Sequence, residues 1–290
     1  MPAPFSDARV DHAQLDSFAF ASRKTPEFMH HRLVRCLRCD LVYADPAPTA
    51  ESLERAYLEA AFDSGIESRH ASCTYGRILD RILDRLPSRT GALDIGAGDG
   101  SFLRELQERD FTDVGGIEPS AAPIAAADPR VRSLIRQGPF TADMSEPESL
   151  SLVTCFQTIE HLHDPLTFCT QARELLRPGG ALLLVAHNRR ALSARVLGER
   201  SPIYDVEHLQ LFSPRSACAL LTQAGLTDVS AWVIVNRYPL TYWVRLSPLP
   251  RGVKDSTIRA LSASPLRSMT VPVPAGNMAV VGFRSRSTAC

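Results

Sequence analysis

The run L-D-I-G-A-G-D-G at residues 93–100 constrains the fold of this chain more than any other stretch. A short apolar segment precedes it, and apolar residues recur at helical spacing over residues 101–109, so the glycines are predicted to lie in a turn between a strand and a helix. Glycine tolerates positive φ and lets a ligand approach the backbone closely. The free amides at a helix start attract negatively polarised groups. This run therefore predicts a turn that contacts a nucleotide-like ligand.

A carboxylate at a suitable spacing sharpens this prediction. Residues 114–117 are predicted to form a second short strand that ends in Glu118, 20 residues after Gly98. In dinucleotide-binding folds a carboxylate at this spacing binds the ribose hydroxyls. The turn has the pattern G-x-G-x-G, led by Asp94, and Ser101 stands where a nicotinamide-binding turn has its third glycine. The sequence therefore disfavours a nicotinamide-dependent oxidoreductase.

Three motifs occur in the order that one known family shows. They are L-D-I-G-A-G-D-G at 93–100, G-I-E-P-S at 116–120 and L-L-R-P-G-G-A-L-L-L at 175–184. Over residues 89–225 the chain closely resembles the class I S-adenosylmethionine-dependent methyltransferases that act on small molecules. The resemblance implies an α/β fold with a doubly wound, Rossmann-like sheet of seven strands, the last of them antiparallel. It also implies S-adenosyl-L-methionine as cofactor and S-adenosyl-L-homocysteine as product.

The resemblance further implies which residues contact the cofactor. They lie in the glycine turn, at the end of the second strand, after the third strand and at the end of the fourth: Asp94, Gly96, Ala97, Gly98, Glu118, Pro119, Phe140 and Gln157. Phe140 is expected to stack on the adenine, and Gln157 to border the methionine half of the cofactor.

The fourth predicted strand leads into T-I-E-H-L-H-D-P, which resembles the family's E-H-L-x-D-P. Ligands of a doubly wound sheet bind beyond the carboxyl ends of its strands. Methyl transfer needs alignment of the reacting atoms and often the removal of one proton. Because imidazole titrates near neutral pH, His161 is the candidate base, with His187 and His208 as secondary candidates. A role of His161 in orienting the cofactor or in packing at a helix start stays open.

Hydrophobic periodicity divides the chain into three regions. Residues 1–48 are predicted to form a small ribbon-like segment, residues 49–88 a helical cover, and residues 89–290 the Rossmann-like core. Two inserts interrupt the core, a lid at 187–212 and a proline-rich, aromatic insert at 236–275. Aromatic side chains of the second insert either line an acceptor pocket or cover the edge of the sheet: Tyr238, Tyr242 and Trp243.

The same periodicity places the individual elements. Helices are expected at 49–62, 68–86, 120–127, 166–176 and 213–224. Strands are expected at 91–95, 114–117, 131–137, 150–157, 181–186, 227–235 and 276–284, and R-P-G-G at 177–180 is expected to separate a helix from the fifth strand.

Cys36 and Cys39 form a C-x-x-C motif between β-prone residues. The motif is like half of a zinc ribbon, and many methyltransferases of this type begin with such a ribbon. A structural zinc site needs four ligands, yet no second C-x-x-C lies upstream, and the nearby substitutes are His12, His30 and His31. The prediction is therefore a knuckle without bound metal. The seven cysteines are odd in number and scattered, which is typical of reduced thiols.

Charge and hydropathy limit the partners. The chain has 32 Lys and Arg against 32 Asp and Glu and no marked basic run, so neither a nucleic acid nor a membrane is predicted as a partner. It shows neither a signal-peptide pattern nor an apolar run of roughly 20 residues, which predicts a cytoplasmic protein. A small-molecule acceptor is expected, and a homodimer is compatible with the sequence.

Three functions are compatible with these motifs. The first is an S-adenosylmethionine-dependent methyltransferase that methylates a hydroxyl of a secondary metabolite, sugar or polyketide. The second is an N-methyltransferase of a small amine or amino sugar. The third is a non-catalytic adenosylmethionine-binding partner protein, because the motifs indicate binding more directly than turnover. A methylated product would separate the first two functions from the third.

Overall fold

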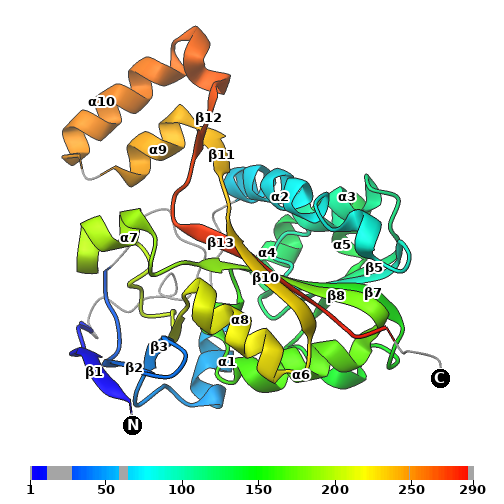
Figure 1. Ribbon diagram of the computed structural model, residues 1–290. Coiled ribbons are helices and arrows are strands. Elements are labelled where there is room, and N and C mark those ends of the chain that lie inside the picture. Colours follow the sequence, from blue (N-terminus) through cyan, green and yellow to red (C-terminus); the bar gives the residue numbers. More distant parts are fainter. Residues whose placement is uncertain (1, 12–27, 59–64, 248, 287–290) are drawn as a thin grey trace.

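The computed structural model describes residues 2–11, 28–58, 65–247 and 249–286 of the 290-residue chain. Its centre is a seven-stranded sheet with the order β10-β13-β8-β7-β4-β5-β6 (Figure 1). The five strands from β8 to β6 are parallel, whereas β13 runs antiparallel to both β8 and β10. The strands are β4 Thr90–Ile95, β5 Thr112–Glu118, β6 Ile135–Gln137, β7 Leu150–Phe156, β8 Leu176–His187, β10 Thr227–Val233 and β13 Asn277–Phe283. The predicted doubly wound sheet with an antiparallel last strand is confirmed.

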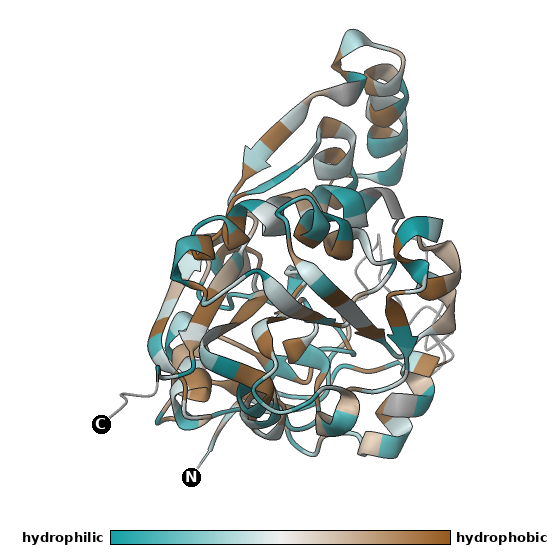
Figure 2. Ribbon diagram, turned by 90° about the vertical axis from the view of Figure 1, so that its right-hand side faces the viewer, coloured by the Kyte–Doolittle hydropathy of each residue, from teal (hydrophilic) through white to brown (hydrophobic). Residues whose placement is uncertain are grey.

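Helices cover both faces of this sheet and bury two apolar clusters (Figure 1). One face packs against α2 (Gly65–Leu79) and α3 (Ser101–Gln107), the other against α6 (Pro165–Leu175) and α8 (Pro214–Gln223). β7 is buried at all seven positions, as expected for a parallel strand covered on both faces. Figure 2 shows the hydrophobic residues concentrated along the strands. Each Leu or Ile fully buried in this way contributes roughly 1.5–3 kcal/mol.

Local sequence signals start the helices that follow β7 and β9. The carboxylate of Asp164 accepts hydrogen bonds from the backbone amides of Leu166 and Thr167 and so caps α6. Ser213 caps α8 through a reciprocal capping box with Ser216. Both helices lie within about one residue of their predicted bounds, a normal uncertainty for helix ends.

The structure corrects three predicted elements. The strand expected at 131–137 begins only at Ile135, because Asp128 caps a short helix, α5 (Pro129–Arg132), that has proline at its first position. The fifth strand begins at Leu176 rather than after the glycines, so residues 177–180 belong to β8, where its register with β7 is irregular. The helix expected at 68–86 ends at Leu79 and is followed by a separate 3₁₀ turn.

The N-terminal segment and the first insert form one further sheet. Its order is β1 (Ala3–Ser6), β2 (Leu33–Arg35), β3 (Val42–Ala44) and β9 (Gln210–Leu211), and β9 comes from the insert. Apolar side chains of this sheet, of α1 (Ala50–Leu58) and of the insert share one cluster. The last residues of the helix predicted at 49–62 lie outside the described residues. The region boundaries predicted at 48 and 88 stay predictions.

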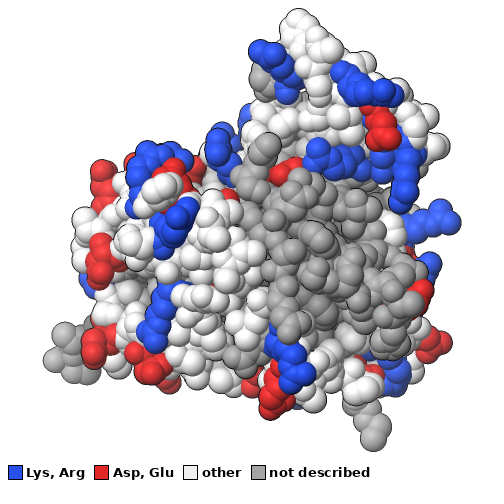
Figure 3. All heavy atoms as spheres, turned by 180° about the vertical axis from the view of Figure 1, so that it is seen from behind, with Lys and Arg blue, Asp and Glu red and all other residues white. Residues whose placement is uncertain are grey.

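The second insert projects away from the sheet as an arm, defined here as residues 236–273 (Figure 1). It consists of β11 (Asn236–Pro239), α9 (Leu240–Leu246), α10 (Arg251–Ser262), a 3₁₀ turn and β12 (Thr270–Val273). Neither of its helices has a buried residue. Figure 3 shows basic and acidic groups together on the described part of the back face. No helix within the described ranges is long and apolar enough to cross a membrane.

Candidate active site

A cavity of about 1010 Å³ lies at the carboxyl ends of the parallel strands, where a doubly wound sheet binds ligands. Its walls come from the turns after β4, β5, β6, β7 and β8, from α2, and from the two inserts. All nine site residues predicted from the sequence line it: Asp94, Gly96, Ala97, Gly98, Glu118, Pro119, Phe140, Gln157 and His161. The structure thus brings the predicted set together in one cavity.

The glycine turn depends on two glycines for different reasons. Gly96 and Gly98 have φ of +74° and +55°, a conformation that side chains disfavour. A Cβ on Gly96 would collide with the side chain of Thr158, whereas a Cβ on Gly98 would meet no protein atom within 4 Å. Gly96 therefore permits packing, and Gly98 leaves open space beside the backbone that a ligand can occupy.

Glu118 braces this turn. Its Oε2 accepts a hydrogen bond from the Gly98 amide and its Oε1 one from the Ser120 amide, both at 2.9 Å. The side chain is largely buried, and burial raises its pKa although the two amides act in the opposite sense. Each carboxylate oxygen retains a further lone pair. The open space at Gly98 and these remaining acceptors fit an adenosine whose ribose hydroxyls donate to Glu118.

Asp94 lies beneath the turn, at the end of β4. Its Oδ1 accepts a hydrogen bond from Thr154 Oγ1 at 2.6 Å, which links β4 to β7. Burial, with a smaller contribution from the charge of Glu118, raises the pKa of Asp94 to about 7. Asp94 therefore lines the cavity with a carboxyl group of reduced charge.

Aromatic rings form the sides of the cavity. Phe140 packs edge-on against Phe168, with ring centroids 5.3 Å apart, so its position is fixed. Tyr238 and Tyr242 of the arm stack at 4.2 Å, and Trp243 packs edge-on against both. All three arm rings line the cavity, so the arm contributes one of its walls.

Three histidines lie together at the far end of the cavity. The ring centroids of His161 and His208, and those of His208 and His187, are 5.0 Å apart. Burial lowers the pKa of His161 to about 4, so its ring is neutral near pH 7 and carries one hydrogen. Its Nδ1 faces the carbonyl oxygen of Glu207 at 3.1 Å and its Nε2 that of Gln157 at 3.0 Å. Both ring nitrogens of His161 are therefore occupied by backbone.

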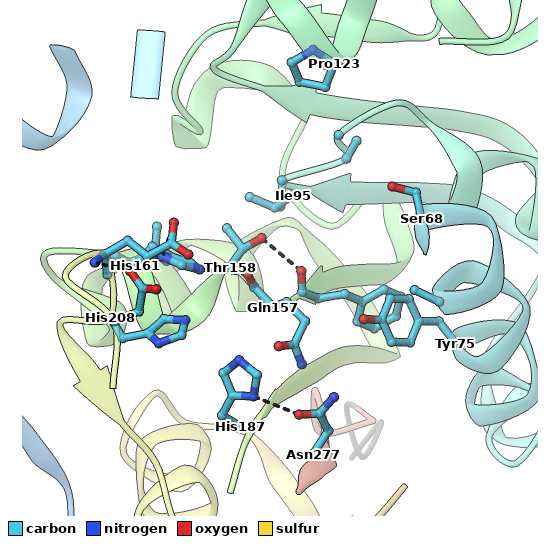
Figure 4. Close-up of a pocket in the computed structure, with 18 of the residues that line it drawn as sticks. Ser68, Tyr75, Ile95, Pro123, Gln157, Thr158, His161, His187, His208 and Asn277 are labelled. Carbon is cyan, nitrogen blue, oxygen red and sulfur yellow. Dashed lines mark hydrogen bonds and ion pairs between the residues drawn. The ribbon is translucent and has the colours of Figure 1, made fainter. Parts of the chain in front are cut away.

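The other two histidines each keep one nitrogen clear of such contacts. His208 Nδ1 lies 2.9 Å from the carbonyl oxygen of Ile203, and His187 Nδ1 lies 2.8 Å from Asn277 Oδ1 (Figure 4). Because these oxygens only accept, Nδ1 carries the hydrogen in both rings and Nε2 presents a lone pair. Sequence reasoning missed Asn277, whose only signal would have been its pairing with His187 across β13 and β8.

The C-x-x-C motif lies at the tip of the β2–β3 hairpin, away from the cavity. Backbone amides of Cys39 and Arg38 lower the pKa of the Cys36 thiol. Among the described residues, the group of His, Cys, Asp and Glu side chains compact enough to hold a cation is His161, Glu207 and His208, and it contains neither cysteine.

The fold and the site together define an α/β protein that binds an adenosine-containing cofactor beyond its parallel strands. A family model described as "Methyltransferase domain" matches residues 68–231, more than half of the chain. The chain therefore belongs to the methyltransferase domain family, and it is an S-adenosylmethionine-dependent methyltransferase with that molecule as cofactor.

Several curated proteins share part of this sequence. The ubiquinone biosynthesis O-methyltransferase of Pseudomonas aeruginosa (strain UCBPP-PA14) is 34% identical over 170 residues, which cover 53% of this chain and 72% of the relative. The protein of the same name from Aeromonas salmonicida is 28% identical over 165 residues, covering 51% and 68%. The chain spans between 63% and 72% of the length of such relatives.

A solved structure shares the fold. It is an S-adenosylmethionine-dependent methyltransferase of Thermotoga maritima, with a TM-score of 0.50 and 18% identity, covering 75% of this chain and 92% of that one. At this identity the likeness concerns the fold alone.

Proposed function

We propose that this methyltransferase methylates a hydroxyl group of a small molecule. The observation that carries the proposal is the continuity of the cavity, which extends from the glycine turn to the histidines. A cofactor held at one end leaves its methyl group facing an acceptor held at the other. The printed names of the relatives, O-methyltransferases, support oxygen over nitrogen as the methylated atom.

The chain's own residues supply positioning. Glu118 and the amides of the glycine turn bind the adenosine, and Phe140 provides a flat apolar surface for its base. Bound S-adenosylmethionine supplies an electrophilic methyl group. The protein must then align the acceptor oxygen and accept its proton.

The proton acceptor is an imidazole of the histidine cluster. His161, the base predicted from the sequence, lines the cavity, but it can accept a proton only after one of its two carbonyl contacts opens. Its place between Gln157 and Glu207 also suits the orienting role that the sequence left open.

The acceptor is proposed to be a secondary metabolite, sugar or polyketide with a planar or apolar part. The stacked arm rings Tyr238 and Tyr242 support this, because aromatic walls bind such groups by stacking. The equal numbers of basic and acidic residues, 32 each, do not favour a polyanionic partner.

The test is product formation with methyl-labelled cofactor and a panel of phenols, sugars and amines, read by mass spectrometry. A labelled ether is the expected product. A labelled amine would establish the N-methyltransferase instead. Binding of the cofactor without any labelled product would favour the non-catalytic protein. Glu118→Ala, which removes the carboxylate expected to bind the ribose, should form less labelled product. Glu146→Ala, which removes an exposed carboxylate outside the cavity, is its control.

A further inference from the structure

Gln157 has an unusual backbone and an unused side chain. It follows the last residue of β7 with φ of +52°, which is uncommon for a residue other than glycine. Its amide donates to the Val185 carbonyl at 2.8 Å, and its carbonyl faces His161, so the backbone is held on both sides. Its side-chain Nε2 is buried without a hydrogen-bond partner among the described residues. A buried donor without a partner is unfavourable, so a ligand that supplies an acceptor there stabilises the complex.

His187 offers an acceptor, the lone pair of its Nε2, where Gln157 offers a donor. It lies directly opposite Asn277 in the antiparallel pair of β8 and β13, so the two side chains share one face. Asn277 Oδ1 fixes the hydrogen on Nδ1, and the His187 backbone amide donates to Glu160 Oε1 at 2.6 Å. The ring and its backbone are thus both anchored.

Both groups point into the same part of the cavity. Figure 4 shows the second ring nitrogen of His187 directed away from Asn277, toward the space between Gln157 and His208. Gln157 and His187 both line the cavity, and they come from the ends of neighbouring strands. The unpaired donor of Gln157 and the lone pair of His187 therefore belong to side chains that border the same space.

A hydroxyl group accepts and donates hydrogen bonds through one oxygen, so it matches this pair. We propose that the acceptor hydroxyl lies between Gln157 and His187, accepting from Gln157 Nε2 and donating to His187 Nε2, and that His187 is the catalytic base. This inference rests on the proposed O-methyl transfer. It assigns to His187 the task that the sequence had given to His161. It also gives Gln157, which the resemblance placed beside the methionine half of the cofactor, a contact with the acceptor.

The oxygen bonds to the methyl carbon while the carbon–sulfur bond breaks and its electron pair stays on sulfur. The O–H bond breaks, and its proton moves to His187 Nε2. The ring is then positively charged, and its Nδ1–H still donates to Asn277 Oδ1, which stabilises that charge. Gln157 keeps the oxygen in place and takes no proton.

Kinetics of four variants test this assignment. His187→Gln should lower kcat by about 100-fold or more, the usual contribution of a general base, with unchanged affinity for the cofactor by calorimetry. Gln157→Ala should mainly raise the KM for the acceptor, whereas the exposed Gln107→Ala should change nothing. His161→Ala should keep a larger kcat than His187→Gln. Turnover by His187→Gln close to that of the wild type would overturn the inference.

A measurement on the wild-type protein decides the inference without turnover. Nitrogen NMR of protein labelled at every nitrogen should find His187 with its hydrogen on Nδ1. Titration of phenol into the complex with S-adenosylhomocysteine should shift the signals of His187 Nε2 and of the Gln157 side-chain amide. A hydrogen on Nε2, or no shift of either signal, would refute the assignment. Failure of every acceptor in the panel would instead count against the proposed function alone.

Discussion

The two ends of the cavity are built from different parts of the chain. The proposed cofactor end uses mainly backbone amides and the carboxylate of Glu118, which two neighbouring strands and their turns place together. The proposed acceptor end uses side chains that lie far apart in sequence and line the cavity, among them Gln157, His187, His208 and Asn277. The backbone conformation of the glycine turn limits the residue types that can occupy it, whereas the side chains of the other end can be substituted one at a time. The acceptor end can therefore change its ligand while the cofactor end keeps its own.

The largest effect is expected at the cofactor end. Gly96→Ala should lower the free energy of unfolding by roughly 2–5 kcal/mol, because it adds a left-handed backbone penalty and a collision with Thr158. Gly98→Ala should lower the free energy of unfolding by about 1–2 kcal/mol, because it adds the left-handed backbone penalty without a collision. Its Cβ should also fill the space proposed for the ligand and so weaken cofactor binding. Urea denaturation and cofactor calorimetry measure the two effects. Equal destabilisation by both variants would contradict the distinction.

The Glu118 carboxylate tests the same end through binding. Glu118→Ala should lower the affinity for S-adenosylmethionine by roughly 100-fold, because a hydrogen bond to a charged group contributes about 1.5–3 kcal/mol. It also removes the brace from the Gly98 and Ser120 amides. Calorimetry against Glu146→Ala measures the loss. Unchanged affinity would remove Glu118 from the cofactor site.

Asn277 tests the acceptor end. Asn277→Leu should lower kcat roughly 10-fold, because one neutral hydrogen bond of about 0.5–1.5 kcal/mol is lost and the hydrogen of His187 is no longer fixed on Nδ1. Asn277→Asp, which keeps an acceptor oxygen, should retain more activity. Cofactor affinity should be unchanged in both. A loss of cofactor binding equal to the loss of turnover would show that the two ends are not separable.

The smallest effect is expected from the Asp40 carboxylate, whose contribution to stability depends on pH. Hydrogen bonds from Arg190, together with the charge of Arg189, lower the pKa of Asp40 from 3.8 to about 2. Because the folded-state pKa lies below the ordinary value, its stabilisation is complete above about pH 4 and is lost as pH falls toward 2. Asp40→Asn should lower stability by about 1 kcal/mol at neutral pH and flatten this acid dependence. Asp110→Asn, which changes a carboxylate that is 90% exposed, is the matched control for acid unfolding.

Sequence reasoning located the glycine turn and its contact with Glu118 because their signals are local. The spacing from Gly98 to Glu118 follows from one strand–helix–strand unit, so a short motif contains the geometry. The placing of the third strand failed where Asp128 and Pro129 start a helix turn within a β-prone run. A cap and a proline outweighed the propensity of the residues that follow them.

The acceptor end was predicted less well because its contacts depend on register. Asn277 reaches His187 only through the pairing of β13 with β8, which no short motif encodes. The occupation of both His161 nitrogens likewise depends on the carbonyl of Glu207, 46 residues away. Periodicity identifies the strands but not which residues face each other across them.

The pairing of β3 with β9 has a consequence for engineering. Val42 and Tyr43 complete a ladder with Leu211 and Gln210, a few residues beyond His208. A chimaera that transplants only the first insert, or a truncation that removes the N-terminal strands, would leave β9 without its strand partner β3 and invite pairing between molecules. To exchange acceptor specificity between relatives, the N-terminal strands and the first insert should therefore be transferred together.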